Sequence, residues 1–217
     1  MTNNLFETQY DLTKKSKFRE FYESNKIWIF STIFAFVIII ASYSYYQNGK
    51  ERKKILLSEK YIQAKVYLEN GNKAKALETL KNITFSNDAT YSILSFFMIL
   101  NENLINENEE ISKLFDHLLE NNKFDKNIEN LLHYKKALFK SNYVSEEKLL
   151  EAAKPLLNSE DILWKGHVLM LIGDFYFSRK EYIKARDFYT QILEIKNLQP
   201  ELYEQAKLKL INIANDQ

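Results

Sequence analysis

The stretch GDFYFSRKEYIKARDFYTQI, residues 173–192, has a spacing that predicts two closely packed helices. A small residue is followed at fixed offsets by an aromatic residue, an alanine and two further bulky residues: Gly173, Tyr176, Ala185, Tyr189 and Ile192. The same offsets recur much earlier in the chain: Ala64, Tyr67, Ala76, Leu80 and Ile83. Small residues at a helix crossing let the two backbones approach, and a tyrosine one turn further on fills the wedge between them. We therefore expect two helix–turn–helix units held together by these repeat-packing residues.

The spacing resembles the tetratricopeptide repeat, a helix pair with a period of 34 residues. The two copies are about three repeat lengths apart, so two further units are expected between them. The second unit, about 89–121, has Ser112 near the alanine position; the third, about 126–158, has Ala137 at the small position but Lys140 in place of tyrosine. Residues 202–213 have no partner and predict a C-terminal capping helix that shields the last apolar face.

Composition favours an all-α fold. The 217 residues include only 4 Gly and 2 Pro, too few turn residues for a β-sandwich. From Lys50 onward apolar residues recur with a period near 3.6, which is typical of amphipathic helices. The first of these helices contains Ile55 and stops at the NGN of residues 70–72. The remaining predicted helices are 73–83, 90–104, 111–119, 128–139, 146–157, 162–177, 182–195 and 202–213.

A membrane span is predicted from the segment IWIFSTIFAFVIIIASYSYY, which extends from Ile27 to Tyr46 and carries no charge. A helix of about 20 residues crosses a hydrocarbon core of roughly 30 Å. The apolar run is longer than that of a signal peptide, and the tyrosines after Ala41 match a cleavage site poorly. We therefore expect a tail at 1–26, an uncleaved transmembrane signal anchor at 27–48 and a helical-repeat domain at 49–217. The bilayer is an expected partner of this anchor.

Flanking charge leaves the orientation of the span open. The positive-inside rule compares Lys and Arg on the two sides, and here each side has five within about 15 residues. The preceding residues are Lys14, Lys15, Lys17, Arg19 and Lys26, and the following ones are Lys50, Arg52, Lys53, Lys54 and Lys60. Both a cytoplasmic and a translocated C-terminal domain are compatible with this tie.

No pattern for catalysis, metal binding or nucleic-acid binding is visible. The formal net charge of +1 gives no electrostatic case for nucleic acid, and the absence of Cys excludes disulfides and thiolate metal sites. The three histidines, His117, His133 and His167, include no pair at the spacing of a metal-binding helix. No phosphate-binding loop or nucleophile motif is present. We expect a non-enzymatic protein without metal, cofactor or small-molecule substrate.

The expected functional surface is the groove lined by the first helix of each repeat. In the fourth unit the spacing places His167, Met170, Asp174 and Phe177 on this side. In the first unit it places Tyr61, Lys65 and Leu68 there. Such a groove accepts a helix or an extended segment of a partner protein. The alternative is that Met170 and Phe177 pack only within the domain.

Most of the chain resembles one bacterial family, the ancillary subunit of the SecYEG translocon (YfgM type). Four segments carry the resemblance by their order and spacing: KFREFYESNK (17–26), ENGNKAKALETL (69–80), DATYSILSFFMIL (88–100) and LWKGHVLMLIGDFYFSRKEYIKARDFY (163–189). The last contains Gly173, Ala185 and Arg186 at the family's positions. The bulky SFFMIL run and the loss of small residues in the middle repeats depart from the family pattern.

The resemblance implies an inner-membrane protein with a cytoplasmic N-terminus and a periplasmic domain. It also implies a scaffold that binds translocon subunits and periplasmic chaperones. The alternative is a general adaptor of another cell-envelope complex, for division or outer-membrane assembly, which the sequence hardly separates from the first. An enzyme or ligand-binding regulator would need a polar pocket with perturbed titratable groups, for which the chain offers no candidate.

Overall fold

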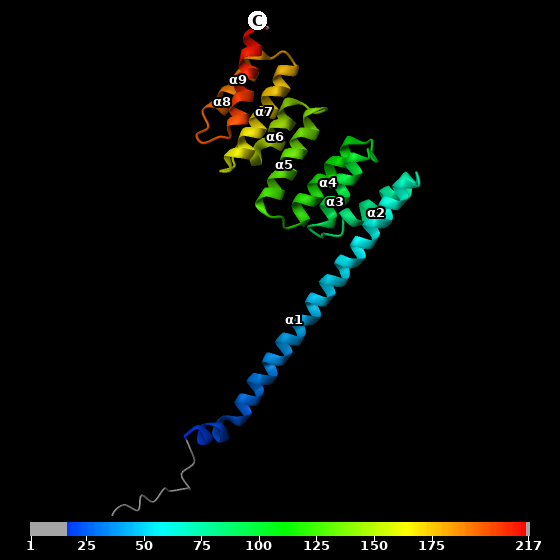
Figure 1. Cartoon of the computed structure of the whole chain (residues 1–217), viewed down its shortest axis with the longest axis vertical. Helices are drawn as coiled ribbons and strands as arrows, with labels where there is room; N and C mark the ends of the chain where they lie inside the picture. Colours follow the sequence, from blue (N-terminus) through cyan, green and yellow to red (C-terminus); the bar gives the residue numbers. More distant parts are fainter. Residues whose placement is uncertain (1–16, 216–217) are drawn as a thin grey trace, which may run out of the picture. The chain divides into compact units, whose positions relative to one another are not determined.

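The computed structural model describes residues 17–215, with side chains from Arg19 onward. Over that range the chain forms nine helices and no strand (Figure 1). The all-α prediction is therefore confirmed, and the predicted tail lies outside the described residues as far as residue 16. The helices are α1 (Lys17–Glu69), α2 (Lys73–Thr84), α3 (Tyr91–Asn101), α4 (Asn108–Asn121), α5 (Lys126–Ser141), α6 (Glu146–Leu157), α7 (Ile162–Ser178), α8 (Tyr182–Leu193) and α9 (Pro200–Asn215).

The chain divides into two compact units, with the junction between Leu56 and Leu57. The first unit contains the N-terminal part of α1, whose apolar side chains are exposed; Trp28 is 77% exposed. The helix is long and apolar enough to cross a membrane, which makes it a candidate membrane span. Thr32 donates a hydrogen bond from Oγ1 to the carbonyl oxygen of Trp28 at 2.8 Å, so this hydroxyl is satisfied within the helix.

The second unit contains two hydrophobic cores. The first core includes Ala64 of α1, Leu80 of α2 and Phe96 of α3, and the second is built from α5 to α9. Helix α5 serves both, because Leu132 lies in the first core and Ala137 in the second. Helix α9 packs mainly on α8 and also touches α7, so it covers the last helix pair as a capping helix.

Helices α1, α3 and α7 end in the same left-handed turn. Gly71, Asn103 and Lys180, each two residues beyond its helix, have φ angles of 74°, 48° and 63°. The next residue donates its backbone N–H to a carbonyl of the last turn: Asn72 to Tyr67 at 2.8 Å, Leu104 to Ile99 at 3.0 Å and Glu181 to Tyr176 at 3.0 Å. This geometry is the Schellman motif. It ends α3 at Asn101, whereas the sequence predicts a helix as far as residue 104.

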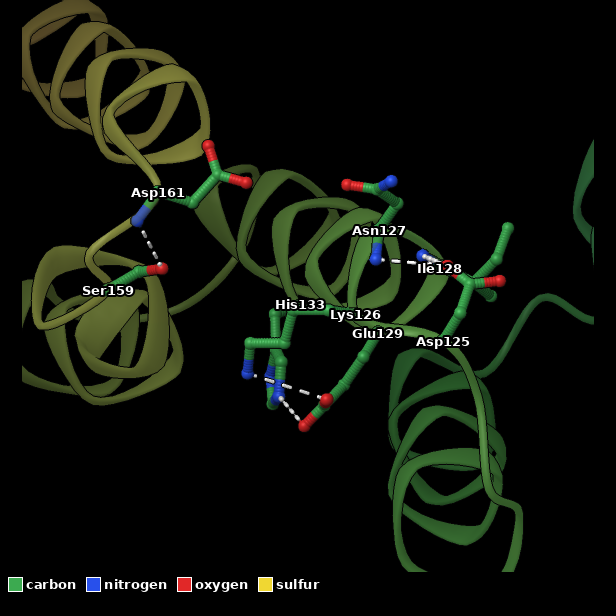
Figure 2. Close-up of polar contacts among 8 residues, drawn as sticks. All are labelled: Asp125, Lys126, Asn127, Ile128, Glu129, His133, Ser159 and Asp161. Atoms are coloured by element: carbon green, nitrogen blue, oxygen red, sulfur yellow. Dashed lines mark hydrogen bonds and ion pairs between the residues drawn. The ribbon is translucent and has the colours of Figure 1, made fainter.

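Side-chain caps fix the starts of α5 and α7 (Figure 2). At α5, Asp125 Oδ1 accepts hydrogen bonds from the backbone N–H groups of Asn127 at 3.0 Å and Ile128 at 3.1 Å. At α7, Asp161 Oδ1 accepts hydrogen bonds from the backbone N–H groups of Leu163 at 3.1 Å and Trp164 at 3.3 Å. The N–H of Asp161 itself donates to Ser159 Oγ at 3.1 Å, which holds the capping residue in place. Because N-caps satisfy otherwise unpaired helix donors, they define where these two helices begin.

The repeat-packing residues lie inside the second unit. Ala64, Ala76, Ala185 and Tyr189 are fully buried, and Tyr176 is 2% exposed. Tyr176 stacks on Phe188 with ring centroids 5.5 Å apart. Gly173 faces the ring of Tyr189. Tyr67 differs from its counterpart Tyr176, because it is only half-buried and its hydroxyl accepts a hydrogen bond from Gln63 at 2.9 Å.

Candidate protein-binding surface

Helices α5 and α7 bring three aromatic side chains together. The rings of Tyr134 and Trp164 have centroids 5.9 Å apart, Tyr134 and His167 5.9 Å, and Trp164 and His167 6.0 Å. All three side chains are half-buried, so each presents one edge or face to solvent. We group these side chains with Asp174 and Phe177 of α7 under the name α5–α7 face.

Asp174 joins the α5–α7 face to two other helices. Its Oδ1 accepts hydrogen bonds from Tyr189 Oη of α8 and from Lys209 Nζ of α9, each at 2.7 Å. The Lys209 ammonium also lies 5.9 Å from the centroid of the Phe177 ring. Burial, followed by the hydrogen bond to Asp174, raises the pKa of Tyr189. Asp174 is therefore held in one position, and α9 borders the face on this side.

The aromatic cluster is uncharged near neutral pH. Burial lowers the pKa of His167, which keeps its imidazole neutral. Burial, followed by the charge of Asp174, raises the pKa of Tyr134. The face thus combines neutral aromatic rings with the Asp174–Lys209 ion pair. Aromatic residues with a polar tip are the side chains that most often dominate protein–protein binding energy.

The four predicted groove residues of α7 do not share one environment. His167 and Asp174 lie on the α5–α7 face. Met170 is 8% exposed and belongs to the second core, so its side chain packs within the domain. Phe177 is half-buried and meets Tyr182 in an edge-to-face contact with centroids 5.6 Å apart. Phe177 therefore serves both the core and the surface.

The three predicted groove residues of α1 lie elsewhere in the second unit. Tyr61 packs against the first core, its ring centroid 6.1 Å from that of Tyr91, and burial raises its pKa. Lys65 is exposed, and Leu68 is half-buried. The residues of α1 and those of α7 thus border different cores, and we treat the α7 set as the candidate site.

Two members of the α5–α7 face were not among the predicted groove residues, Tyr134 and Trp164. The sequence contains a signal for Tyr134: it lies three residues before Ala137, just as Met170, a predicted groove residue, lies three residues before Gly173. The third repeat unit matches the pattern too weakly for that offset to stand out. Trp164 starts the fourth unit, but its contact with α5 joins residues far apart in sequence.

A second polar cluster joins α6, α7 and α8. Glu146 accepts a hydrogen bond from Lys184 at 2.9 Å, and Lys184 also pairs with Glu181 at 2.9 Å. A hydrogen bond from the Tyr176 hydroxyl, followed by that from Lys184, lowers the pKa of Glu146. Burial, and then the hydrogen bond to Glu146, raises the pKa of Tyr176 to about 12. These groups satisfy one another across three helices, which is a structural arrangement rather than a set of free acids and bases.

Within residues 17–215 no group of three or more His, Asp or Glu side chains is placed to hold a metal ion. A family model described as a tetratricopeptide repeat-like domain matches residues 19–215. No curated protein and no solved structure gives a significant match to the chain.

Proposed function

Because this chain belongs to the tetratricopeptide repeat-like domain family, we propose that it is a non-enzymatic scaffold that binds partner proteins. Repeats of this type build extended surfaces for protein partners. The candidate membrane span within α1 anchors the scaffold in a lipid bilayer. Anchoring confines the domain to the membrane surface and raises its effective concentration towards other membrane proteins, so weak contacts suffice.

The observation that carries this proposal is the aromatic cluster of Tyr134, Trp164 and His167. Trp and Tyr are enriched among the residues that supply most of the energy of protein–protein interfaces. Here the three side chains are half-buried on two neighbouring helices and fixed by mutual ring contacts. A partner that covers the cluster gains apolar burial with little loss of side-chain freedom. The α5–α7 face is therefore the proposed binding surface.

For the partner we propose subunits of the SecYEG translocon, with periplasmic chaperones as further partners. The support is the order and spacing of the four family-like segments, which extend from the residues before the span to α8. In this arrangement the protein lies in the inner membrane, with its N-terminus in the cytoplasm and residues 49–217 in the periplasm. The span at 27–48 holds the helical domain beside the export channel, where newly exported chains meet chaperones.

The test is affinity purification of the full chain from membranes solubilised in a mild detergent, with partners identified by mass spectrometry. We expect translocon subunits to be recovered with the wild-type chain. The double variant Tyr134→Ala/Trp164→Ala should lose most of this recovery. A matched control is Phe85→Ala, which removes an aromatic side chain that is 49% exposed just after α2, where its ring contacts His117 of α4.

The outcomes of this purification separate the two candidate functions. Recovery of a division or outer-membrane assembly complex without translocon subunits would replace the translocon proposal with the general adaptor. Recovery that is unchanged in the double variant would contradict the α5–α7 face as the binding surface.

A further inference from the structure

A second candidate site lies away from the α5–α7 face, where the two cores meet on α5. An open pocket of about 280 Å³ is bounded by the end of α3, the start of α4 and one side of α5. Its floor is apolar and includes Ile99, Ile105, Phe115 and Phe139. The rings of Phe115 and Phe139 are in contact, with centroids 6.0 Å apart. Phe115 is fully buried, so the half-buried Phe139 is the aromatic ring that the pocket can present to a ligand.

The pocket results from an irregularity in the helix stacking. Helix α5 packs along α7, whereas α3 and α5 make little direct contact. Helix α3 is short because its left-handed turn at Asn103 ends it early. Farther along, Tyr143 and Ser112 share a hydrogen bond of 2.8 Å between their hydroxyls, which links the end of α5 to α4. The pocket is therefore bordered by fixed elements.

The edge of the pocket is positively charged. Lys135 is exposed and forms no ion pair with any residue between Arg19 and Asn215. Its neighbour Lys136 pairs instead with Asp116 of α4. Asn103 and Asn142 also line this opening, and Asn142 Nδ2 donates a hydrogen bond to the carbonyl oxygen of Leu138 at 3.4 Å. A ligand that complements this edge carries a carboxylate next to an apolar group.

The size of the pocket narrows the class of ligand. At about 280 Å³ it is smaller than the pockets of roughly 300–1,000 Å³ that enclose drug-sized molecules. It suits one large apolar side chain on a segment that continues across the surface. We propose that this pocket docks a Leu or Phe side chain flanked by Asp or Glu residues in a segment of a partner protein. This inference rests on the proposed scaffold function and adds the kind of partner sequence that the scaffold prefers.

The test uses the full chain in detergent micelles with labelled isoleucine methyl groups, followed by NMR. The probes are three 12-residue peptides of Gly and Ser. One carries a single Leu between two Glu residues, one replaces that Leu with Ser, and one replaces both Glu residues with Lys. We expect the Glu-Leu-Glu peptide to shift the methyl signals of Ile99 and Ile105. Its affinity should exceed that of either control peptide by about tenfold or more.

The variant Lys135→Glu should abolish this preference and favour the Lys-flanked peptide. Lys113→Glu, an exposed lysine of α4 that does not line the pocket, should leave the preference intact. The proposal is overturned if no peptide shifts the pocket signals, if the Lys-flanked peptide binds equally well, or if Lys135→Glu has no effect. The affinity purification described above depends on the α5–α7 face, whereas the peptide test depends on the pocket beside α5. Failure of the peptide test therefore leaves the scaffold function standing, and the loss of translocon recovery in the purification is a separate result that the peptide test does not produce.

Discussion

The ring of Tyr189 occupies the space where a side chain at Gly173 would begin. A Cβ atom built on Gly173 would lie 2.4 Å from Tyr189 Cε1 and 2.7 Å from its Cδ1. The ring cannot easily move, because Tyr189 is fully buried and its hydroxyl is bonded to Asp174. At the corresponding positions the first repeat has Ala64, which is larger than glycine, and Leu80, which is smaller than tyrosine. Both pairs fill the space where their two helices cross: the fourth repeat pairs a glycine with a large ring, and the first pairs an alanine with a smaller leucine.

Gly173→Ala should destabilise the domain by about 1–2 kcal/mol. The overpacking of a buried ring costs about 1–3 kcal/mol and outweighs the gain of up to about 1 kcal/mol from replacing Gly with Ala in a helix. The double variant Gly173→Ala/Tyr189→Leu recreates the first-repeat pair. It should be more stable than the sum of the two single changes predicts. Urea unfolding of the full chain in detergent, followed by circular dichroism, measures all three variants.

Gly166→Ala is the matched control within α7. The added Cβ would meet the end of the Leu202 side chain at 2.6 Å, and such an end can rotate away. We expect a smaller loss of stability than for Gly173→Ala. Additive effects in the double variant would contradict the proposed coupling between residues 173 and 189.

Lys180→Gly should stabilise the domain by up to about 1 kcal/mol, since a left-handed backbone is strained for any residue with a Cβ. Lys180 has a φ of 63°, and Gly71 holds the same place after α1 with a φ of 74°. Lys180→Ala keeps the backbone strain while it removes the charge, so it should not increase the stability of the domain. Gly71→Ala should destabilise by about 1 kcal/mol. If Lys180→Ala stabilises the domain as much as Lys180→Gly does, the removed charge and not the backbone strain is the cause, which would contradict this prediction.

Stability should fall as the pH is lowered from 7 to about 5.5. Burial lowers the pKa of both His133 and His167. For His133 the effect of burial outweighs that of the Glu129 carboxylate, which acts in the opposite direction and whose Oε1 lies 3.9 Å from His133 Nε2 (Figure 2). Below pH 6.5 the unfolded chain binds protons that the folded chain does not, so acid favours unfolding; above it the two states are equally neutral.

The double variant His133→Gln/His167→Gln removes these two groups and should flatten the pH dependence in that window. The measurement is the midpoint of urea unfolding at pH 7.0, 6.5, 6.0 and 5.5. A wild-type midpoint that rises towards pH 5.5, or a double variant with the wild-type slope, would contradict the assignment.

The orientation of the protein can be tested with a reporter enzyme fused after Gln217. We expect a fused alkaline phosphatase, which needs an oxidising compartment, to be active. A fusion of the same reporter before the span should be inactive. The reverse pattern would place the helical domain in the cytoplasm. Flanking Lys and Arg cannot settle this in advance, because they are equally numerous on the two sides of the span.

The sequence pattern was most informative where the helices are amphipathic. Helix α6 has the predicted bounds, 146–157, because its apolar face alternates clearly with charged residues. Helix α3 ends before the predicted residue 104, because Asn103 adopts a left-handed conformation that periodicity does not reveal. The first repeat helix is continuous with the candidate span in α1, since the intervening Lys50–Lys54 segment consists of good helix formers.

The candidate site was less predictable for a physical reason. Helix α7 packs against α5, α6, α8 and α9, so it is apolar nearly all round and its sequence has no single buried stripe. Spacing alone therefore could not separate buried Met170 from half-exposed His167. The pairing of Asp174 with Lys209 and the contact of Tyr134 with Trp164 depend on how distant helices stack.

We propose that the α5–α7 face contacts the translocon in the membrane. The most direct measurement is photo-crosslinking in intact cells with benzoylphenylalanine in place of Trp164, compared with the same group at Lys148, an exposed residue of α6. We predict a crosslinked product that contains a translocon subunit from position 164 and none from position 148. Products from position 164 that contain only other proteins, or no product at all, would contradict the claim.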